Sequence, residues 1–312
     1  MILTITPNPA IDLTITTPVF APGTTHVVPP ARQRAGGKGL NVARVLSQTG
    51  FTTRAIAPVG HDDAAWFAAD LSQGSETGVG QGPATELLPC AGVTRRTYAL
   101  VESETGRTSM VTESGPERTD AEWRQLIDLV KRNAHKADAL VLSGSLPPAH
   151  PENLVSEIVG LGHGAGARVI ADVNGRALVS AARAGAHTLK PNLDELRAAT
   201  GATDPVTGGR TLQSEGAGLV IVSLGDEGML AVPAARTAAV LHARLGRTLQ
   251  GNPTGAGDAA VAAIATCVTR AELPEVLRRA VAWSAAAVLA PLAGTLHESY
   301  PDLSHEVVVS EI

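Results

Sequence analysis

Short, mostly apolar runs recur along the chain and constrain its fold more than any other feature. Most of them lack the apolar–polar alternation of a strand with one wet face, which is typical of strands buried on both faces. The runs are Ile2–Thr6, Arg54–Ala57, Ala139–Ser143, Arg168–Ala171, Thr188–Lys190 and Leu219–Ser223. The sequence therefore predicts a sheet that is covered on both sides.

Helical patterns lie between these runs. They cover Leu40–Ser47, Asp62–Gln73, Asp120–Ala134, Glu152–Leu161, Leu193–Thr200, Thr207–Glu215, Asp258–Val268 and Pro274–Leu289. Strands that alternate with helices favour one open, mainly parallel sheet with helices on both faces. Aromatic residues are only 3% of the chain, so Ala, Val, Leu and Ile must build the core, which suits parallel strands under Ala-rich helices.

A second kind of strand interrupts this alternation of buried strands and helices. Apolar and polar residues alternate in Leu13–Thr17, Thr97–Val101 and Ser109–Thr112, the last two joined through a turn at Gly106. Alternation predicts half-exposed strands. We expect a small β-sheet lid over the mouth of the main sheet, built from about residues 11–34 and 92–114 of a single domain spanning 1–312.

Charge and cysteine content exclude several classes of protein. The net charge is −5 and no Lys/Arg run reaches four, so we expect no nucleic acid partner. Cys90 and Cys267 form neither a disulfide framework nor a zinc spacing. The longest apolar stretch, Ala280 to Ala290, is too short to cross a bilayer, and no secretion signal precedes the first strand. We expect a cytoplasmic protein without a membrane partner.

One motif carries recognisable chemistry. It reads Asn252-Pro253-Thr254-Gly255-Ala256-Gly257-Asp258 and precedes an apolar helix. Gly255 and Gly257 allow a tight turn, and amides at a helix N-terminus converge on an anion. A transferring phosphoryl group needs such a cradle. Asp258 in the first helical turn could accept a proton from an attacking alcohol.

Two other interpretations of this motif stay open at this stage. Asp258 could be an ordinary N-cap after a glycine turn. Gly255-x-Gly257-x-x-Ala260 also satisfies the loose dinucleotide pattern, as does Gly160-x-Gly162-x-x-Ala165, although neither opens an evident βαβ unit. The sequence contains no Walker A motif, and its histidines show no metal-ligand spacing.

Six motifs in order resemble the PfkB/ribokinase family of carbohydrate kinases, within its branch of 1-phosphofructokinase and tagatose-6-phosphate kinase. They are Thr6–Asp12, Ala35–Arg44, Ser143–Pro147, Lys190–Leu196, Ser223–Gly228 and Asn252–Asp258. The resemblance covers essentially the whole chain and implies a ribokinase-like three-layer α/β/α fold with a mainly parallel central sheet and a small β-sheet lid. It departs at Asp172-Val173-Asn174-Gly175, where the branch usually has Ser in place of Asn174.

The resemblance also implies roles for single residues. Asp12 and Asn41 would hold sugar hydroxyls, and Gly36 and Gly37 would let the sugar approach the backbone. Lys38 and Arg95 would bind the phosphate that the substrate already carries, and Glu113 would line the same site. The residues implied for ATP are Lys190, Asn192, Ser223, Gly225 and Gly228. Asn192 and Glu195 would organise Mg²⁺ through water. Gly255, Ala256 and Gly257 would present amides to the phosphoryl group, and Asp258 would be the catalytic base.

The function implied is ATP- and Mg²⁺-dependent phosphorylation of a ketohexose phosphate, first of all fructose 1-phosphate to fructose 1,6-bisphosphate. Tagatose 6-phosphate and fructose 6-phosphate are the next candidates, and a ribokinase-like or nucleoside kinase is third. A non-catalytic nucleotide or sugar-phosphate sensor and a dinucleotide-dependent oxidoreductase are the alternatives from other classes. An exposed lid face could join two copies in a homodimer.

Overall fold

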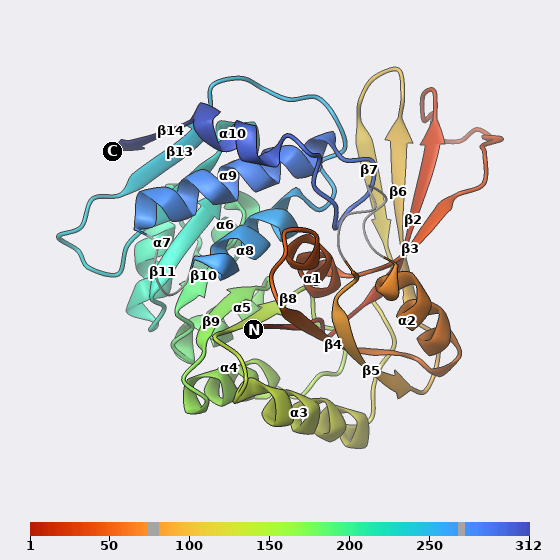
Figure 1. Cartoon of the computed structure of the whole chain (residues 1–312), viewed down its shortest axis with the longest axis horizontal. Coiled ribbons are helices and arrows are strands. Elements are labelled where there is room, and N and C mark those ends of the chain that lie inside the picture. Colours follow the sequence, from red (N-terminus) through yellow and green to blue (C-terminus); the bar gives the residue numbers. More distant parts are fainter. Residues whose placement is uncertain (74–80, 268–271) are drawn as a thin grey trace.

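A long twisted sheet crosses the middle of the molecule (Figure 1). The computed structural model describes residues 1–73, 81–267 and 272–312. In sheet order the strands of these residues are β14 (Val307–Glu311), β13 (Leu241–Leu245), β12 (Met229–Val232), β11 (Leu219–Ser223), β10 (Thr188–Leu189), β9 (Arg168–Asp172), β8 (Ala139–Ser143), β1 (Ile2–Ile5), β4 (Thr53–Gly60) and β5 (Ala84–Cys90). The six strands predicted from apolar runs are confirmed as β1, β4, β8, β9, β10 and β11.

The sheet is parallel from β5 to β11 and antiparallel from β11 to β14. The predicted mainly parallel sheet is therefore confirmed. Parallel strands place their carboxyl ends along one edge, where open α/β sheets bind ligands. Ser143, Asp172 and Ser223 end their strands at this edge, and Lys190 directly follows β10.

Helices cover both faces of this sheet and complete the predicted three layers. Their bounds are α1 (Lys38–Gln48), α2 (Ala64–Ser72), α3 (Asp120–Ala134), α4 (Leu154–Gly164), α5 (Arg176–Arg183), α6 (Leu193–Thr200), α7 (Pro205–Ser214), α8 (Ala256–Thr266), α9 (Leu273–Leu289) and α10 (Tyr300–Glu306). One core packs α1, α8 and α9 against the sheet, and the other packs α3 to α7 against the opposite face.

The eight helices predicted from periodicity are all present. The predicted end of one of them, Val268, lies outside the described residues. Two short 3₁₀ turns, η1 (His61–Asp63) and η2 (Gly225–Glu227), join the helices and strands. Among the described residues no helix is both long and apolar enough to cross a membrane.

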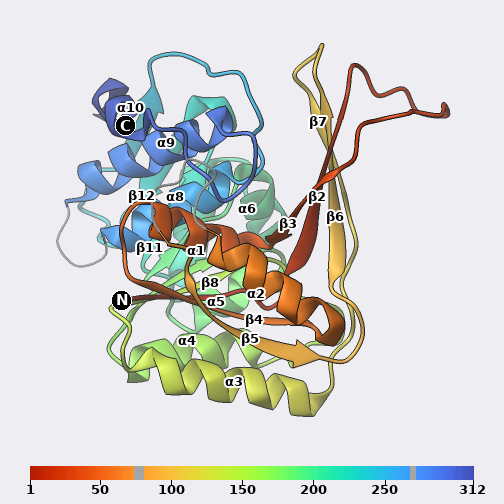
Figure 2. The ribbon, with the colours of Figure 1, turned by 45° about the vertical axis from the view of Figure 1, so that its right-hand side comes forward.

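A second, smaller sheet stands beside the main body, where β2, β6 and β7 project away from it (Figure 2). Its strand order is β3 (Arg32–Gly36), β2 (Ala10–Thr17), β6 (Arg95–Glu102) and β7 (Thr108–Thr112). The three strands predicted from alternation are present as β2, β6 and β7. Burial is mixed along β2 and β6, as predicted, whereas β7 is mostly exposed. Because β3 leads directly into α1, this sheet is joined to the carboxyl edge of the main sheet.

Candidate active site

The start of α8 has the geometry of an anion cradle. Gly255 is the N-cap, with φ +88° and no side-chain cap, so its conformation suits glycine and leaves the first amides of α8 without a side-chain acceptor. A Cβ placed on Gly257 would lie 3.6 Å from Nζ of Lys190. The amides of α8 and the Lys190 ammonium group therefore lie together, which favours a negative ligand.

Asp258 lies in the first turn of α8 and is only 6% exposed. Asn41 on α1 donates from Nδ2 to Asp258 Oδ2 at 2.8 Å. Burial raises the pKa of Asp258 to about 7, while Lys38 and Asn41 act in the opposite direction. A carboxylate with a pKa near the operating pH is well suited to act as a general base.

Both alternative interpretations of the glycine motif fail in this geometry. Gly255 is the N-cap of α8, so Asp258 is not a capping residue. The strand that precedes α8, β13, ends at Leu245, and the next helix is α9. Without a βαβ unit, Gly255 and Gly257 lack the context of a dinucleotide site. Gly160 and Gly162 lie inside α4 and do not open it.

A cluster of charges adjoins Asp258. Lys38 Nζ lies 3.4 Å from Asp172 Oδ2 and 3.7 Å from Glu195 Oε1, and Lys190 Nζ lies 3.6 Å from Asp172 Oδ1. The hydroxyl of Ser143 also donates to Asp172 Oδ2 at 3.1 Å. Burial raises the pKa of Asp172, but the two lysines and this hydroxyl hold it below its ordinary value. Asp172 raises the pKa of Lys38 above its ordinary value despite burial. Both groups are therefore charged at neutral pH.

The residues expected to bind the nucleotide lie at the ends of two adjacent strands. Asn192 follows β10 and pairs with Ser223, the last residue of β11, through an isolated bridge. Beyond Ser223, the turn closes when Leu224 N donates to Gly228 O at 2.8 Å. Gly228 has φ +90°, and a Cβ there would overlap the carbonyl of Ala243. The predicted residues Lys190, Asn192, Ser223, Gly225 and Gly228 therefore occupy one short stretch of the carboxyl edge.

Asn192 and Glu195 form a capping box at the start of α6. Asn192 Oδ1 accepts from Glu195 N at 2.8 Å, and Asn192 N donates to Glu195 Oε2 at 2.9 Å. This reciprocal pair gives a structural reason for their spacing. Glu195 Oε1 remains directed towards Lys38.

The oxygen donors of this region suit a hydrated Mg²⁺ better than a direct protein cage. Within the described ranges no three His, Cys, Asp or Glu residues form a metal-holding group. Asp172 Oδ1 is buried without a hydrogen-bond partner and lies 3.6 Å from Lys190 Nζ, and Glu195 Oε1 lies 3.7 Å from Lys38 Nζ. Since Mg²⁺ keeps several waters and binds through few carboxylates, these two oxygens fit ligands of its water shell.

Asp12, Gly36 and Gly37 lie where the small sheet meets the start of α1. A Cβ on Gly36 would overlap the Asp12 carboxylate, so a larger residue there would displace that carboxylate. Thr97 donates its hydroxyl to Asp12 Oδ1. Burial raises the pKa of Asp12, and the bond from Thr97 and the charge of Arg95 oppose this rise.

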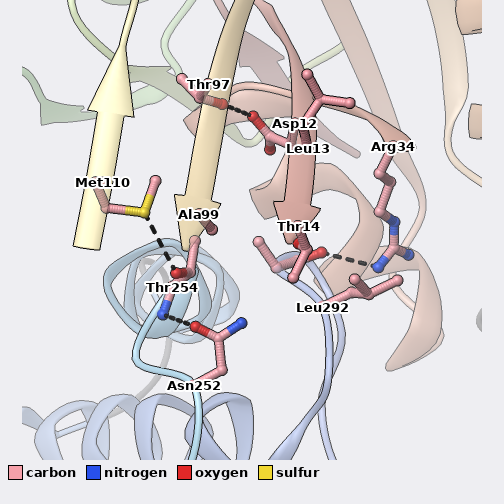
Figure 3. A pocket seen from close by; sticks show the side chains of 11 residues that line it. Asp12, Leu13, Thr14, Arg34, Thr97, Ala99, Met110, Asn252, Thr254 and Leu292 are labelled. Atoms are coloured by element: carbon pink, nitrogen blue, oxygen red, sulfur yellow. Dashed lines mark hydrogen bonds between the residues drawn. The ribbon is translucent and has the colours of Figure 1, made fainter. Parts of the chain in front are cut away.

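Asp12 also borders a pocket between the small sheet and the loop before α8 (Figure 3). Thr97, Met110 and Arg34 line it from the small sheet, and Asn252 and Thr254 line it from the loop. The hydroxyl of Thr254 lies 3.9 Å from the sulfur of Met110. The small sheet therefore touches the loop that leads into the cradle.

Arg95 and Glu113 lie in a separate depression. Arg95 donates to the carbonyl of Asn8 from Nε at 3.2 Å and from Nη2 at 3.0 Å, and to the carbonyl of Glu113 from Nη1 at 3.0 Å. The carboxylate of Glu113 accepts from Arg96 N at 2.7 Å. Ser145 and His150 line the other side of the depression. The contacts of Arg95 and Lys38 are thus with different groups, and their binding of one shared phosphate stays a prediction.

Sequence reasoning missed the part that Asp172 and Ser143 play in this site. Asp172 stands at the end of a buried strand, which is a signal in the sequence, but its partners Lys38 and Lys190 come from other elements. Arg34 was also missed, and its side chain is buried in contact with residues near the carboxyl end of the chain.

Comparison with known proteins gives a consistent result. Residues 6–299 match the family model described as "pfkB family carbohydrate kinase". A 1-phosphofructokinase of Xanthomonas campestris is 34% identical over 90% of this chain and 89% of its own. An ATP-dependent 6-phosphofructokinase isozyme 2 of Mycobacterium tuberculosis is 31% identical over 93% of this chain and 84% of its own. Among solved structures, the tetrameric inhibited form of phosphofructokinase-2 from Escherichia coli superposes with a TM-score of 0.85 at 26% identity, covering 97% of this chain and 98% of that one.

Proposed function

This chain belongs to the pfkB family of carbohydrate kinases, and we propose that it transfers a phosphoryl group from ATP to a ketohexose phosphate, converting fructose 1-phosphate to fructose 1,6-bisphosphate. One observation carries the proposal: Asp258, with a pKa of about 7, stands beside the amides of a glycine turn and the ammonium group of Lys190. This arrangement combines a base for an alcohol with a cradle for a phosphoryl group.

The reaction follows from the placement of these groups. ATP lies along the ends of β10 and β11, and the sugar lies between Asp12, Asn41 and Asp258. Asp258 takes the proton of the terminal hydroxyl as that oxygen attacks the γ-phosphorus in line, and the bond to the leaving ADP oxygen breaks. Amides of Gly255 to Gly257 offset the charge on the equatorial oxygens. Glu195 and Asp172 would hold the water shell of Mg²⁺, which would supply positive charge to offset that of the phosphates.

The ion pairs of Lys38 favour a role at the migrating phosphoryl group. Its ammonium group is held by Asp172 and Glu195, and its charge acts on Asp258. Arg95 is the better candidate for the acceptor's own phosphate. A guanidinium has five N–H donors, and three of its hydrogen bonds are made to Asn8 and Glu113, so two donors remain for phosphate oxygens. Ser145 adds a hydroxyl to the same depression.

The small sheet serves as the lid in this proposal, because closure over the sugar excludes water and limits ATP hydrolysis. Its outer strand β7 exposes Met110 and Val111, which are 50% and 56% exposed. We propose a homodimer that covers this face. Sedimentation of the wild type and of a Val111→Asp variant tests it: a dimer that becomes monomeric supports the proposal, and a wild-type monomer contradicts it.

A panel of acceptors in a coupled ADP-release assay tests the function. The panel contains fructose 1-phosphate, fructose 6-phosphate, tagatose 6-phosphate, fructose and ribose. We expect the highest kcat/KM for fructose 1-phosphate. A higher value for either 6-phosphate would reassign the substrate within the family, since relatives named for both activities are similarly distant. ATP binding without turnover of any sugar would make the protein a sensor.

A further inference from the structure

Residues 291–296, called the strap here, lie in the connection between α9 and α10, and Leu292 and Ala293 of the strap line the pocket beside the cradle loop. Asn252 Nδ2 donates to the carbonyl of Pro291 at 3.4 Å at one end of the strap. At the other end, Gln48 on α1 exchanges two bonds with the backbone of Leu296, at 2.8 and 2.9 Å. The strap is therefore fixed to both the cradle loop and α1.

The middle of the strap is held by a single charged side chain. Arg34 on β3 donates from Nη1 to the carbonyl of Ala293 at 2.9 Å and to the hydroxyl of Thr295 at 2.7 Å. Arg34 is 9% exposed and Thr295 is 5% exposed. Because both side chains are buried, loss of these bonds would leave polar groups without a partner, which is unfavourable. Figure 3 shows the guanidinium of Arg34 beside Leu292 of the strap.

From its middle the strap touches two parts of the catalytic machinery. A Cβ placed on Gly255 would lie 2.9 Å from Cα of Ala293, so the strap backs directly onto the cradle glycine. A Cβ placed on Gly294 would lie 3.0 Å from Oδ1 of Asn41, the residue that hydrogen-bonds Asp258. Neither Gly255 nor Gly294 has room for a side chain, so the strap packs closely against the cradle and against Asn41.

We propose that Arg34 is a positioning residue for phosphoryl transfer. Through Ala293 it presses the strap against Gly255, and through Gly294 it keeps Asn41 aligned with Asp258. This inference rests on the proposed kinase function and adds to it a residue that acts through its hydrogen bonds to the strap. Because Arg34 stands opposite Asp12 in the β2–β3 register, the same side chain joins the base of the lid to the cradle.

The test compares Arg34→Met, Arg34→Lys and Thr295→Val with the wild type, using ATP and the acceptor that the wild type prefers. We expect Arg34→Met to lower kcat roughly 10- to 100-fold, since small misplacements of reacting groups are costly, with KM for ATP changed by less than about twofold. Arg34→Lys restores kcat to within about fivefold of the wild type, because an ammonium group can still reach one acceptor. Thr295→Val, which removes one of two bonds, has a loss of about threefold.

The pH profile separates positioning from simple stability. Lys38, Asp172 and Lys190 face Asp258 and are unchanged in these variants. The hydrogen bond from Asn41 favours the charged form of Asp258. In Arg34→Met this bond should be weaker, so the pKa of Asp258 rises and the acid limb of kcat moves to higher pH by about half a unit. Arg118→Met is the matched control, because Arg118 is also buried and donates to a backbone carbonyl, that of Pro58 on β4.

The results distinguish a failure of the positioning role of Arg34 from a failure of the proposed kinase function. Arg34→Met with unchanged kcat and an unmoved acid limb overturns the positioning role, as does a loss no larger than that of Arg118→Met. A wild type that phosphorylates no sugar phosphate overturns the proposed function instead. If Arg34→Met does not fold, Thr295→Val and Arg34→Lys still decide the matter through the same limb.

Discussion

The pH dependence of turnover provides a quantitative test of the environment of Asp258. With a pKa of about 7, about nine tenths of Asp258 is ionised at pH 8 and about one tenth at pH 6. If the ionised form is the base, kcat should fall nearly tenfold between these values. An aspartate with the ordinary value of 3.8 would be about 99% ionised at both, and kcat would stay flat.

Asn41→Ala sharpens this prediction. The bond from Asn41 Nδ2 lowers the pKa of Asp258, and a hydrogen bond to a charged group contributes about 1.5 kcal/mol or more. Its loss should raise the pKa by about one unit, so that kcat at pH 7 falls about fivefold.

A discontinuous assay of ADP release at saturating substrate concentrations, from pH 5.5 to 9, gives kcat as a function of pH and so locates the acid limb. Substrate phosphates titrate near pH 6, but they do so equally for every variant. Asn133→Ala is the control, since Asn133 is a buried asparagine on α3 that hydrogen-bonds Glu86. An acid limb at the same pH in Asn41→Ala and the wild type would refute the reasoning.

Three further perturbations test single contacts of the site. Asp258→Asn should raise Tm at pH 8 relative to the wild type, because an aspartate whose pKa rises from 3.8 to about 7 on folding destabilises the protein progressively between these pH values and fully above about pH 7. The difference should shrink at pH 5.5, and its absence at pH 8 would contradict the raised pKa. Gly255→Ala should lower both kcat and Tm because of its φ of +88° and its contact with Ala293, whereas Gly246→Ala, with open space around it, should change neither. Lys38→Met should mainly lower kcat and Arg95→Gln should mainly raise KM for the acceptor; steady-state kinetics that show the reverse would restore Lys38 to the acceptor's phosphate.

The sequence predicted the buried parallel strands well and the edge strands poorly. The runs that became β8 and β11 are apolar because helices cover both faces of the sheet there. In contrast, β5 contains Glu86 and Pro89 and lies at the edge of the sheet, and β14 at the opposite edge is largely exposed. An edge strand carries no continuous apolar signal, since only part of its surface is buried.

The candidate site also has a part that the sequence predicted and a part that it did not. The cradle and Asp258 could be predicted because seven adjacent residues contain the whole local chemistry. The charge cluster could not, because Lys38, Asp172 and Lys190 meet only when α1, β9 and β10 reach the same edge. For the same reason Arg34 gave no signal, since its partners on the strap lie near the other end of the chain.

The most direct test of the central claim is the rate of phosphoryl transfer by Asp258→Asn when ATP and acceptor are both bound. Quenched-flow single turnover measures the chemical step, and fluorescence titration measures ATP affinity. Loss of a general base should slow the step by about 10²- to 10⁴-fold while ATP binds as tightly as in the wild type. Transfer at a near wild-type rate would show that Asp258 does not activate the hydroxyl.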